Sequence, residues 1–237
     1  MSKPFRCKQF TVHHHKSAMK VGTDSLLLGA WTSLNNKPAK ILDIGTGCGI
    51  LALQMAQRSD ALTINAIEHD AESYEQAVEN FENSPWPDRL FCYHCTLQEY
   101  TAEIDEQYNL IISNPPFYTS NTISTDKRRT NARNTVSLSF KTLLKAVHIL
   151  LSKNGVFSLI LPHSEESNFI LLAKNEGFFL QKICRINDKP QSPVKRSLMI
   201  FGFECKKVEL THLTLKDNNR QYSLDFKNLL REFYLEF

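Results

Sequence analysis

The chain has 237 residues, of which 42% are hydrophobic and 22% charged, and this composition suits one large domain with a sizeable core. Its net charge of +3 is too small to attract nucleic acid by itself, so RNA binding would need local clusters of cations. No apolar run approaches the roughly 20 residues of a membrane helix. The first residues lack the apolar core of a secretory signal.

The first 39 residues contain one helical pattern, the stretch MKVGTDSLLLGAW at residues 19–31. Thr23 or Asp24 is suited to cap a helix whose apolar side includes Leu26 and Leu27. Packing on a sheet edge explains the leucines but not the lead-in at residues 20–24, and we include Thr23 among the candidate cofactor-binding residues. We expect residues 1–39 to form an N-terminal segment with this capping helix, ahead of a domain that spans residues 40–237.

From residue 40 onwards, apolar strand-like stretches alternate with helical patterns. Strands are predicted at residues 40–45, 62–67, 90–94, 108–113, 155–162, 179–186 and 197–204. Helices are predicted at residues 50–57, 71–81, 138–151 and 164–175, and a last short helix, capped by Ser223, is predicted to run through Leu235. This order predicts an α/β fold, with a seven-stranded, mostly parallel, doubly wound sheet and helices on both faces.

A glycine-rich turn follows the first of these strands. The stretch LDIGTGCG places Asp43, Gly45 and Gly47 where backbone amides can approach a ligand at the carboxyl edge of the sheet. Ile50 replaces the third glycine of the dinucleotide pattern, and an acid before the turn would oppose a pyrophosphate. S-Adenosylmethionine carries an ammonium and a sulfonium but no phosphate. Because Glu68 ends the next strand, where it can accept both ribose hydroxyls, the sequence predicts that S-adenosylmethionine binds here.

The strand at residues 108–113 ends in the sequence NPPF. Its two prolines remove backbone donors and fix the backbone, which favours one rigid loop. Methyl transfer to an exocyclic amine needs rigid acceptors, because acceptors around the two N–H bonds free the nitrogen lone pair. The Asn114 carboxamide oxygen and the Pro115 carbonyl are suited to this role, and Phe117 is suited to stack on a planar substrate.

The motifs DIGTGCG and NPPF resemble those of class I S-adenosylmethionine-dependent methyltransferases that modify amino groups. The stretches FTVHHHKSAMKVGTDSLLLGAW, NSPW, LIISNPPFY, NAR and YSLDFKNLLREFYL are similar to the bacterial tRNA-valine adenine-N6 methyltransferase family. The resemblance implies a Rossmann-like fold, S-adenosylmethionine as cofactor, the tRNA anticodon stem-loop as partner and methylation of adenosine 37. It also implies that Thr96 stands where the family usually has an acid that contacts the cofactor adenine.

Cations cluster after the NPPF loop. Between residues 121 and 145, six cations face the single acid Asp126, and they are suited to hold phosphates that flank a target base. A solvated loop is the competing interpretation. The candidate substrate-binding residues here are Tyr118, Lys127, Arg128, Arg129 and Arg133. Arg185, Lys189, Lys195 and Arg196 form a second group near the stretch KPQSPVKRS, a loop of the kind that recognises substrates. Lys195 and Arg196 are its candidate substrate-binding residues.

Six scattered cysteines without export features indicate reduced thiols and a cytoplasmic protein. Cys92 and Cys95 form a Cys-x-x-Cys without a second ligand pair, so buried cysteines are favoured over zinc or redox chemistry. For the histidine triplet at residues 13–15, a solvated or RNA-facing loop is favoured over a metal site. We therefore expect no metal.

Other functions remain compatible with these motifs. Ribosomal-RNA guanine-N2 methylation uses the same NPPF loop, and protein glutamine-N5 methylation shares the NPP sequence but needs no cation cluster. A non-catalytic RNA-binding module with the same fold is a third alternative, and the presence of Asp43, Glu68 and Asn114 argues against it.

Overall fold

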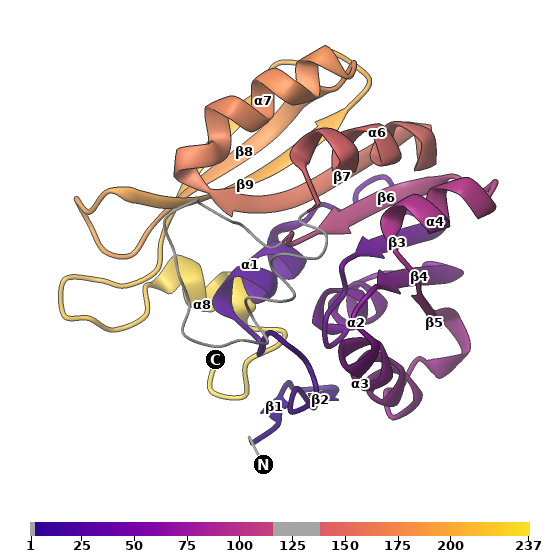
Figure 1. Cartoon of the computed structure of the whole chain (residues 1–237). Coiled ribbons are helices and arrows are strands. Elements are labelled where there is room, and N and C mark those ends of the chain that lie inside the picture. Colours follow the sequence, from indigo (N-terminus) through magenta and orange to yellow (C-terminus); the bar gives the residue numbers. More distant parts are fainter. Residues whose placement is uncertain (1–2, 116–137) are drawn as a thin grey trace.

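The computed structural model describes residues 3–115 and 138–237. Within them, an eight-stranded sheet has the order β10-β8-β9-β7-β6-β3-β4-β5 (Figure 1). Its strands are β3 (Lys40–Ile44), β4 (Thr63–Glu68), β5 (Leu90–His94), β6 (Tyr108–Ser113), β7 (Leu151–Pro162), β8 (Phe179–Asn187), β9 (Val194–Gly202) and β10 (Glu209–Thr214). Neighbours are parallel, except that β9 is antiparallel to β7 and β8. The predicted α/β fold with a mostly parallel sheet is confirmed.

The sheet has one strand more than the seven predicted. The additional strand, β10, lies at the edge of the sheet and pairs in parallel with β8. Of its residues, Leu213 is buried, whereas Leu210 is 51% exposed. A half-exposed edge strand of this kind gives little of the apolar signal by which the other strands are recognised.

Helices cover both faces of the sheet, as the alternating pattern predicted. The helices are α1 (Thr23–Trp31), α2 (Ile50–Arg58), α3 (Ala71–Glu82), α4 (Leu97–Glu103), α6 (Phe140–Leu150), α7 (Glu166–Asn175) and α8 (Leu224–Leu230). One apolar cluster joins α1, α2, α3 and α8 to side chains such as Ile41, and the other joins α4, α6 and α7 to side chains such as Leu42. Successive residues of β3 thus serve opposite faces, which is the period of a strand buried on both sides.

The helix starts follow local capping chemistry in most cases. Asp70, Thr96, Ser139 and Ser223 each accept a hydrogen bond from a backbone N–H in the first turn of the following helix. The predicted cap of α1 was wrong, because the residue before its first turn is Gly22, which has no side chain to cap with. Thr23 and Asp24 lie inside the helix.

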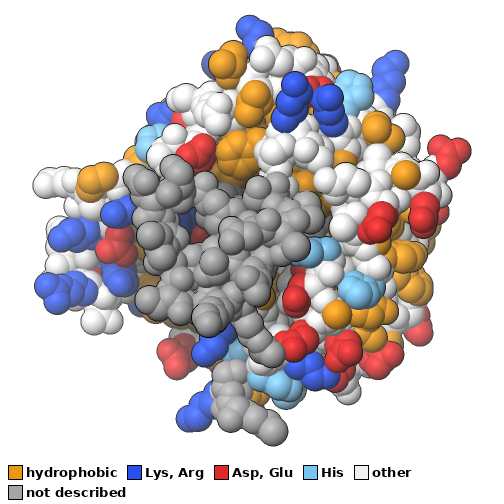
Figure 2. Space-filling view, viewed as in Figure 1, with side chains coloured by type: hydrophobic (Ala, Val, Ile, Leu, Met, Phe, Trp, Pro, Cys, Tyr) orange, Lys and Arg blue, Asp and Glu red, His pale blue; other side chains and the backbone are white. Residues whose placement is uncertain are grey.

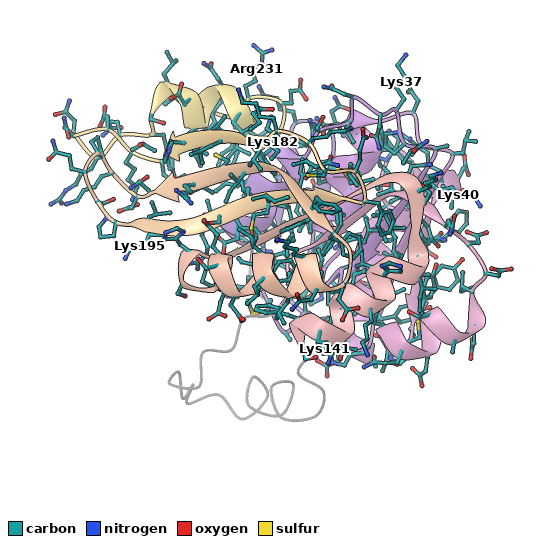
Figure 3. The ribbon with its side chains drawn as sticks, turned by 90° about the horizontal axis from the view of Figure 1, so that it is seen from above. Lys37, Lys40, Lys141, Lys182, Lys195 and Arg231 are labelled. Carbon is teal, nitrogen blue, oxygen red and sulfur yellow. The ribbon has the colours of Figure 1, made fainter. Side chains whose placement is uncertain are left out.

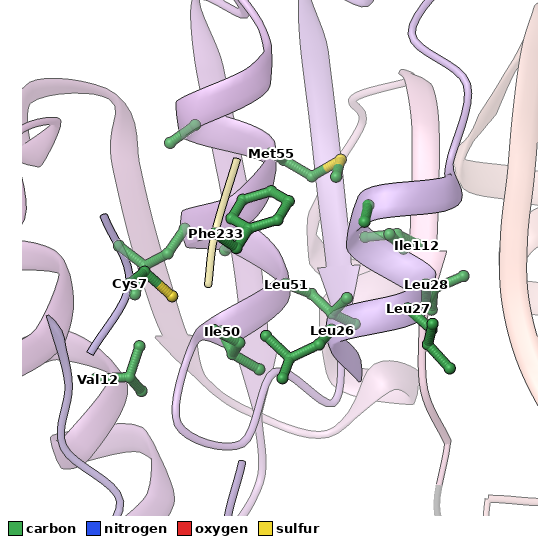
Figure 4. Close-up of a cluster of buried hydrophobic side chains, with 14 of the residues drawn as sticks. Cys7, Val12, Leu26, Leu27, Leu28, Ile50, Leu51, Met55, Ile112 and Phe233 are labelled. Atoms are coloured by element: carbon green, nitrogen blue, oxygen red, sulfur yellow. The ribbon is translucent and has the colours of Figure 1, made fainter. Parts of the chain in front are cut away.

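The N-terminal segment shares its core with the C-terminal helix. The short strands β1 (Phe5–Arg6) and β2 (Thr11–Val12) form a hairpin. Cys7, directly after β1, forms an isolated antiparallel β-bridge with Tyr234. Figure 4 shows the buried side chains that meet here, with Cys7 and Val12 from the hairpin and Phe233 from the C-terminal segment around α1 and α2. Because α1 packs into this cluster, its position relative to the sheet is fixed from both ends of the chain. The division of the chain at residue 39 stays a prediction.

Candidate functional site

The register of the sheet brings the predicted site residues to one edge. Ile44 at the end of β3 is paired with Ile67 of β4 and Ser113 of β6. Their successors Gly45, Glu68 and Asn114 therefore leave the sheet side by side, at the carboxyl ends of three parallel strands, where open α/β sheets bind ligands.

Asp43 is completely buried near the end of β3. Its Oδ2 accepts hydrogen bonds from Thr46 Oγ1 at 2.5 Å and from the Ala52 backbone N–H at 3.2 Å. Its Oδ1 has no hydrogen-bond partner among the residues that the structure describes. Burial raises the pKa of Asp43 to about 7, although the two hydrogen bonds oppose the rise. A buried carboxylate oxygen without a partner is an acceptor that a cationic ligand can use.

The glycine turn is open toward the edge of the sheet. Gly45 and Gly47 have φ angles of 71° and 58°, which only glycine adopts without strain, and a Cβ at either position would meet no described residue within 4 Å. At Gly49, in contrast, a Cβ would lie 2.5 Å from the Phe81 ring. Gly49 therefore serves close packing of α3, whereas Gly45 and Gly47 border space that the described part of the chain leaves open to a ligand.

Glu68 connects the glycine turn to the end of β4. The carboxylate is buried, and its Oε2 accepts from the Gly47 N–H at 2.9 Å. Its Oε1 accepts from the backbone N–H groups of His69 and Asp70 at 2.9 and 3.0 Å. A hydrogen bond to Glu68 raises the pKa of the His69 ring. Glu68 thus braces the turn, and its Oε2 retains capacity for a further donor.

These residues fit a cofactor with a cation and hydroxyl groups. Asp43 offers the unpartnered acceptor, Glu68 offers a second acceptor, and the backbone at Gly45 and Gly47 borders the space between. Two carboxylates at this turn would repel a pyrophosphate. These acidic acceptors therefore favour a nucleoside linked to an amino acid over a dinucleotide as the ligand.

Two other candidate cofactor residues make no hydrogen bond to these groups in the described part of the chain. Thr96 caps α4 in a capping box, in which its hydroxyl donates to Glu99 Oε2 at 2.8 Å and accepts from the Glu99 N–H at 3.2 Å. The first task of Thr96 is therefore structural, with part of its acceptor capacity left. Thr23 is exposed at the start of α1 and makes no side-chain hydrogen bond with the described residues.

Asn114 is half-buried directly after β6. Its amide Nδ2 donates to Ser25 Oγ of α1 at 2.8 Å, and its Oδ1 has no partner within residues 3–115 and 138–237. Pro115 beside it is buried. Sequence reasoning did not find Ser25, because nothing in its spacing relates it to a loop 89 residues further along the chain. The candidates Phe117, Tyr118, Lys127, Arg128, Arg129 and Arg133 lie outside the described residues.

The second group of cations is partly neutralised. Arg196 Nε donates to Asp24 Oδ2 at 2.8 Å, which ties β9 to the first turn of α1. Lys195 is exposed at the projecting end of the β8–β9 hairpin (Figure 3) and has no ion pair with the described residues. Lys195 is therefore the member of this pair with a charge available to a partner.

On the face seen in Figure 2, acidic and basic side chains are interspersed among the coloured residues, and no uniform basic field covers that visible surface.

Cys92 and Cys95 are partly buried and unpaired. Within the described residues, no group of three histidine, cysteine or acidic side chains is close enough to hold a metal ion. Nor does any helix in that part of the chain have the length and apolarity to cross a membrane.

The strand order and the antiparallel β9 are those of the Rossmann-like methyltransferase fold. Residues 15–161 match the family model described as methyltransferase small domain. The chain is 45% identical to a Flavobacterium psychrophilum protein and 46% identical to a Christiangramia forsetii protein. The alignments cover 98% and 99% of this chain and 99% of each relative, and both relatives are named tRNA1(Val) (adenine(37)-N6)-methyltransferase. The chain therefore belongs to this methyltransferase family.

Solved structures agree on the fold. The crystal structure of a predicted O-methyltransferase from Agrobacterium tumefaciens superposes with a TM-score of 0.68 at 18% identity, over 89% of this chain and 96% of the other. At this identity, the similarity concerns the architecture alone.

Proposed function

We propose that this enzyme transfers a methyl group from S-adenosylmethionine to the exocyclic N6 of adenosine 37 in tRNA-Val. The observation that carries the proposal is the orientation of Asn114 at the carboxyl edge, with its amide nitrogen bound by Ser25 and its oxygen free of the described residues. An acceptor beside the cofactor turn is what an exocyclic amine requires, and the relatives at 45% and 46% identity name the substrate.

S-Adenosylmethionine, when bound, supplies a methyl group that its sulfonium activates. Asp43 Oδ1 is the acceptor for the cofactor ammonium, and Glu68 is the acceptor for the ribose hydroxyls. The turn at Gly45 and Gly47 provides the space between them. Thr96 at the start of α4 is the acceptor for a hydrogen bond from the adenine in this proposal.

The chain's own contribution to the reaction lies in holding the target amine. The Asn114 Oδ1 and the Pro115 carbonyl accept hydrogen bonds from its two N–H groups. These hydrogen bonds draw the nitrogen lone pair away from the adenine ring and toward the methyl group. The amine proton becomes acidic once the nitrogen is alkylated, so no side chain has to act as a strong base. Phe117 stacks on the adenine in this proposal, and Tyr118 is a further substrate contact.

Binding of the tRNA anticodon stem-loop rests on cations. Lys195 is free to contact phosphates, and Arg196 lies beside it, paired with Asp24. We assign the main phosphate contacts to Lys127, Arg128, Arg129 and Arg133 from their sequence positions. The cytoplasm, where tRNA and reduced thiols occur together, is the proposed location.

The test of the substrate uses isotope-labelled S-adenosylmethionine with total tRNA, ribosomal RNA and protein in separate reactions, followed by nucleoside and amino-acid analysis. We expect label in N6-methyladenosine from tRNA. Label in N2-methylguanosine from ribosomal RNA, or in methylated glutamine, would overturn the proposal in favour of the corresponding alternative.

The test of the mechanism is Asn114→Ala. We expect a loss of turnover of about 10²–10³-fold, because one fixed transition-state acceptor is removed. Binding of S-adenosylhomocysteine and the melting temperature should stay close to wild type. Asn114→Asp retains an acceptor and should keep activity above that of Asn114→Ala in single-turnover assays on an anticodon stem-loop. A folded, cofactor-binding Asn114→Ala enzyme with wild-type turnover would refute the mechanism.

A further inference from the structure

The first turn of α1 contacts the NPPF loop through one side chain. Asn114 Nδ2 donates to Ser25 Oγ across 2.8 Å, and within residues 3–115 and 138–237 this is the hydrogen bond that the Asn114 carboxamide makes. We propose that Ser25 is a positioning residue, which holds the Asn114 carboxamide in the place that methyl transfer needs. The inference rests on the proposed function, since it concerns the acceptor used there.

The orientation matters because a carboxamide has two different ends of similar shape. With Nδ2 bound to Ser25, the oxygen faces away from α1 and can accept an N–H of the target amine. After a flip of the amide, an NH2 group would face the amine, and two donors would oppose each other. A serine hydroxyl can accept from Nδ2 or donate to Oδ1, so Ser25 fixes the place of the carboxamide by one hydrogen bond, while the N–H groups of the target amine favour the orientation in which Oδ1 faces them.

Ser25 can do this because α1 is held firmly. The five residues that follow it, from Leu26 to Ala30, are buried. The buried Gln54 Nε2 of α2 donates to the Leu26 carbonyl at 3.1 Å, and Arg58 Nη1 donates to the Gly29 carbonyl at 2.5 Å. These bonds join α1 to the helix that begins at the cofactor turn.

A second contact fixes the turn of α1 in which Ser25 lies. Asp24 accepts from Arg196 of β9 at 2.8 Å, so the residue before Ser25 is anchored to the central part of the sheet. Asp24 and Ser25 thus bind two neighbouring parts of the carboxyl edge, the start of β9 and the loop after β6. Ser25 therefore reaches Asn114 from a position defined independently of the loop.

The test compares Ser25→Ala with Ser25→Thr, which keeps the hydroxyl, and with Ser33→Ala beyond the other end of α1. For Ser25→Ala we expect kcat to fall by about 2- to 12-fold, the equivalent of one net hydrogen bond, with unchanged KM for tRNA and unchanged affinity for S-adenosylhomocysteine. Ser25→Thr should restore most of the loss, and Ser33→Ala should behave as wild type. A Ser25→Ala enzyme with wild-type kcat, or with weakened cofactor binding, would overturn the proposal.

A second background separates positioning from a general effect on the fold. In Asn114→Ala no carboxamide is left for Ser25 to hold. Ser25→Ala should then change kcat by less than about 2-fold, within the lower limit of one hydrogen bond. An equal loss in both backgrounds would contradict the role assigned to Ser25.

The third measurement does not depend on activity. In the NMR spectrum, the Asn114 side-chain amide protons, assigned by comparison with Asn114→Asp, should shift upfield in Ser25→Ala and return in Ser25→Thr. Unchanged shifts would refute the hydrogen bond itself. A wild-type enzyme that leaves tRNA unmodified would refute the proposed function, while the NMR result would still decide whether Ser25 holds Asn114.

Discussion

Asp43 is a carboxylate without solvent contact, and burial raises its pKa from the ordinary 3.8 to about 7. The folded state therefore holds the proton more tightly than the unfolded chain. The stability that this protonation contributes is complete below pH 3.8 and is lost as the pH rises through about 7. The loss amounts to at most about 4 kcal/mol. Ionisation of Asp43 near neutral pH lowers the free energy of unfolding when no ligand is bound. A cation bound beside the ionised carboxylate would offset this loss, so the site suits a cationic ligand.

The prediction concerns Asp43→Asn. In the wild type, affinity for S-adenosylhomocysteine should rise between pH 5.5 and 8, because the ionised carboxylate binds the ligand ammonium better than the neutral acid does. In Asp43→Asn both this rise and the fall in unfolding free energy over the same range should largely disappear. Calorimetry and denaturant titrations at several pH values measure the two effects. A variant that keeps the wild-type pH dependence would show that another group is responsible.

At the scale of single residues, sequence alone gave the parts of the site that belong to short motifs. Asp43, Gly45 and Gly47 share one turn, and the structure brings Glu68 to it by the strand register. The contact of Ser25 with Asn114 and the Asp24–Arg196 ion pair were not predicted, because the partners come from distant parts of the chain. Sequence patterns report local chemistry, whereas contacts between elements depend on how the elements pack.

At the scale of elements, α1 and α2 pack closely around Gly29. A Cβ at this position would overlap Gln54 Oε1 and lie 2.9 Å from its Nε2, which donates to the Leu26 carbonyl. Gln54 is fully buried, so its amide has little room to move away. The absence of a side chain at Gly29 therefore permits the contact that holds Ser25 in place.

Gly29→Ala is accordingly expected to destabilise the fold by about 1–3 kcal/mol, as overpacking in a core does. It should also lower kcat, since it displaces α1. The matched control is Gly22→Ala in the same segment, where a Cβ would have its nearest neighbour at 4.0 Å. Thermal and urea unfolding of both variants decide the matter. Equal stability of Gly29→Ala and wild type would mean that Gln54 rearranges without cost.

Elements were predictable where burial gives a strong period. The strands β3 to β9 and the helices α2, α3, α6 and α7 are present close to their predicted positions. Helix α8 begins after its predicted cap Ser223 but ends at Leu230 instead of Leu235. The short α4 and the edge strand β10 were missed, because few of their residues are buried. The cap of α1 was mispredicted, because Gly22 leaves the N-terminal N–H groups without a side-chain acceptor while Asp24 serves Arg196 instead. Tertiary contacts overrode a local preference there.

At the scale of the whole molecule, strand direction decides which surfaces face the substrate. β9 runs antiparallel to β7, so its start at Val194 lies at the carboxyl edge with Asn114, and its end at Gly202 lies at the opposite edge. Lys195 is thus on the carboxyl edge, whereas Lys206 follows the far end of β9 and pairs with Glu204 at 2.9 Å. Two lysines near the ends of one strand therefore offer a test of which edge meets RNA.

The last prediction follows from this polarity. If Lys195 contacts a tRNA phosphate, Lys195→Ala should weaken binding and flatten the slope of log affinity against log salt by about 0.7 to 0.9. Removing two of Lys127, Arg128, Arg129 and Arg133 should flatten it by about 1.4 to 1.8, and the effects should add because separate phosphates are involved. Lys206→Ala is the control and should leave the slope unchanged. Fluorescence anisotropy of a labelled anticodon stem-loop across a salt series measures all of these. A slope that responds to Lys206 as strongly as to Lys195 would show that RNA is held by diffuse charge, and the carboxyl edge would lose its assignment as the docking surface.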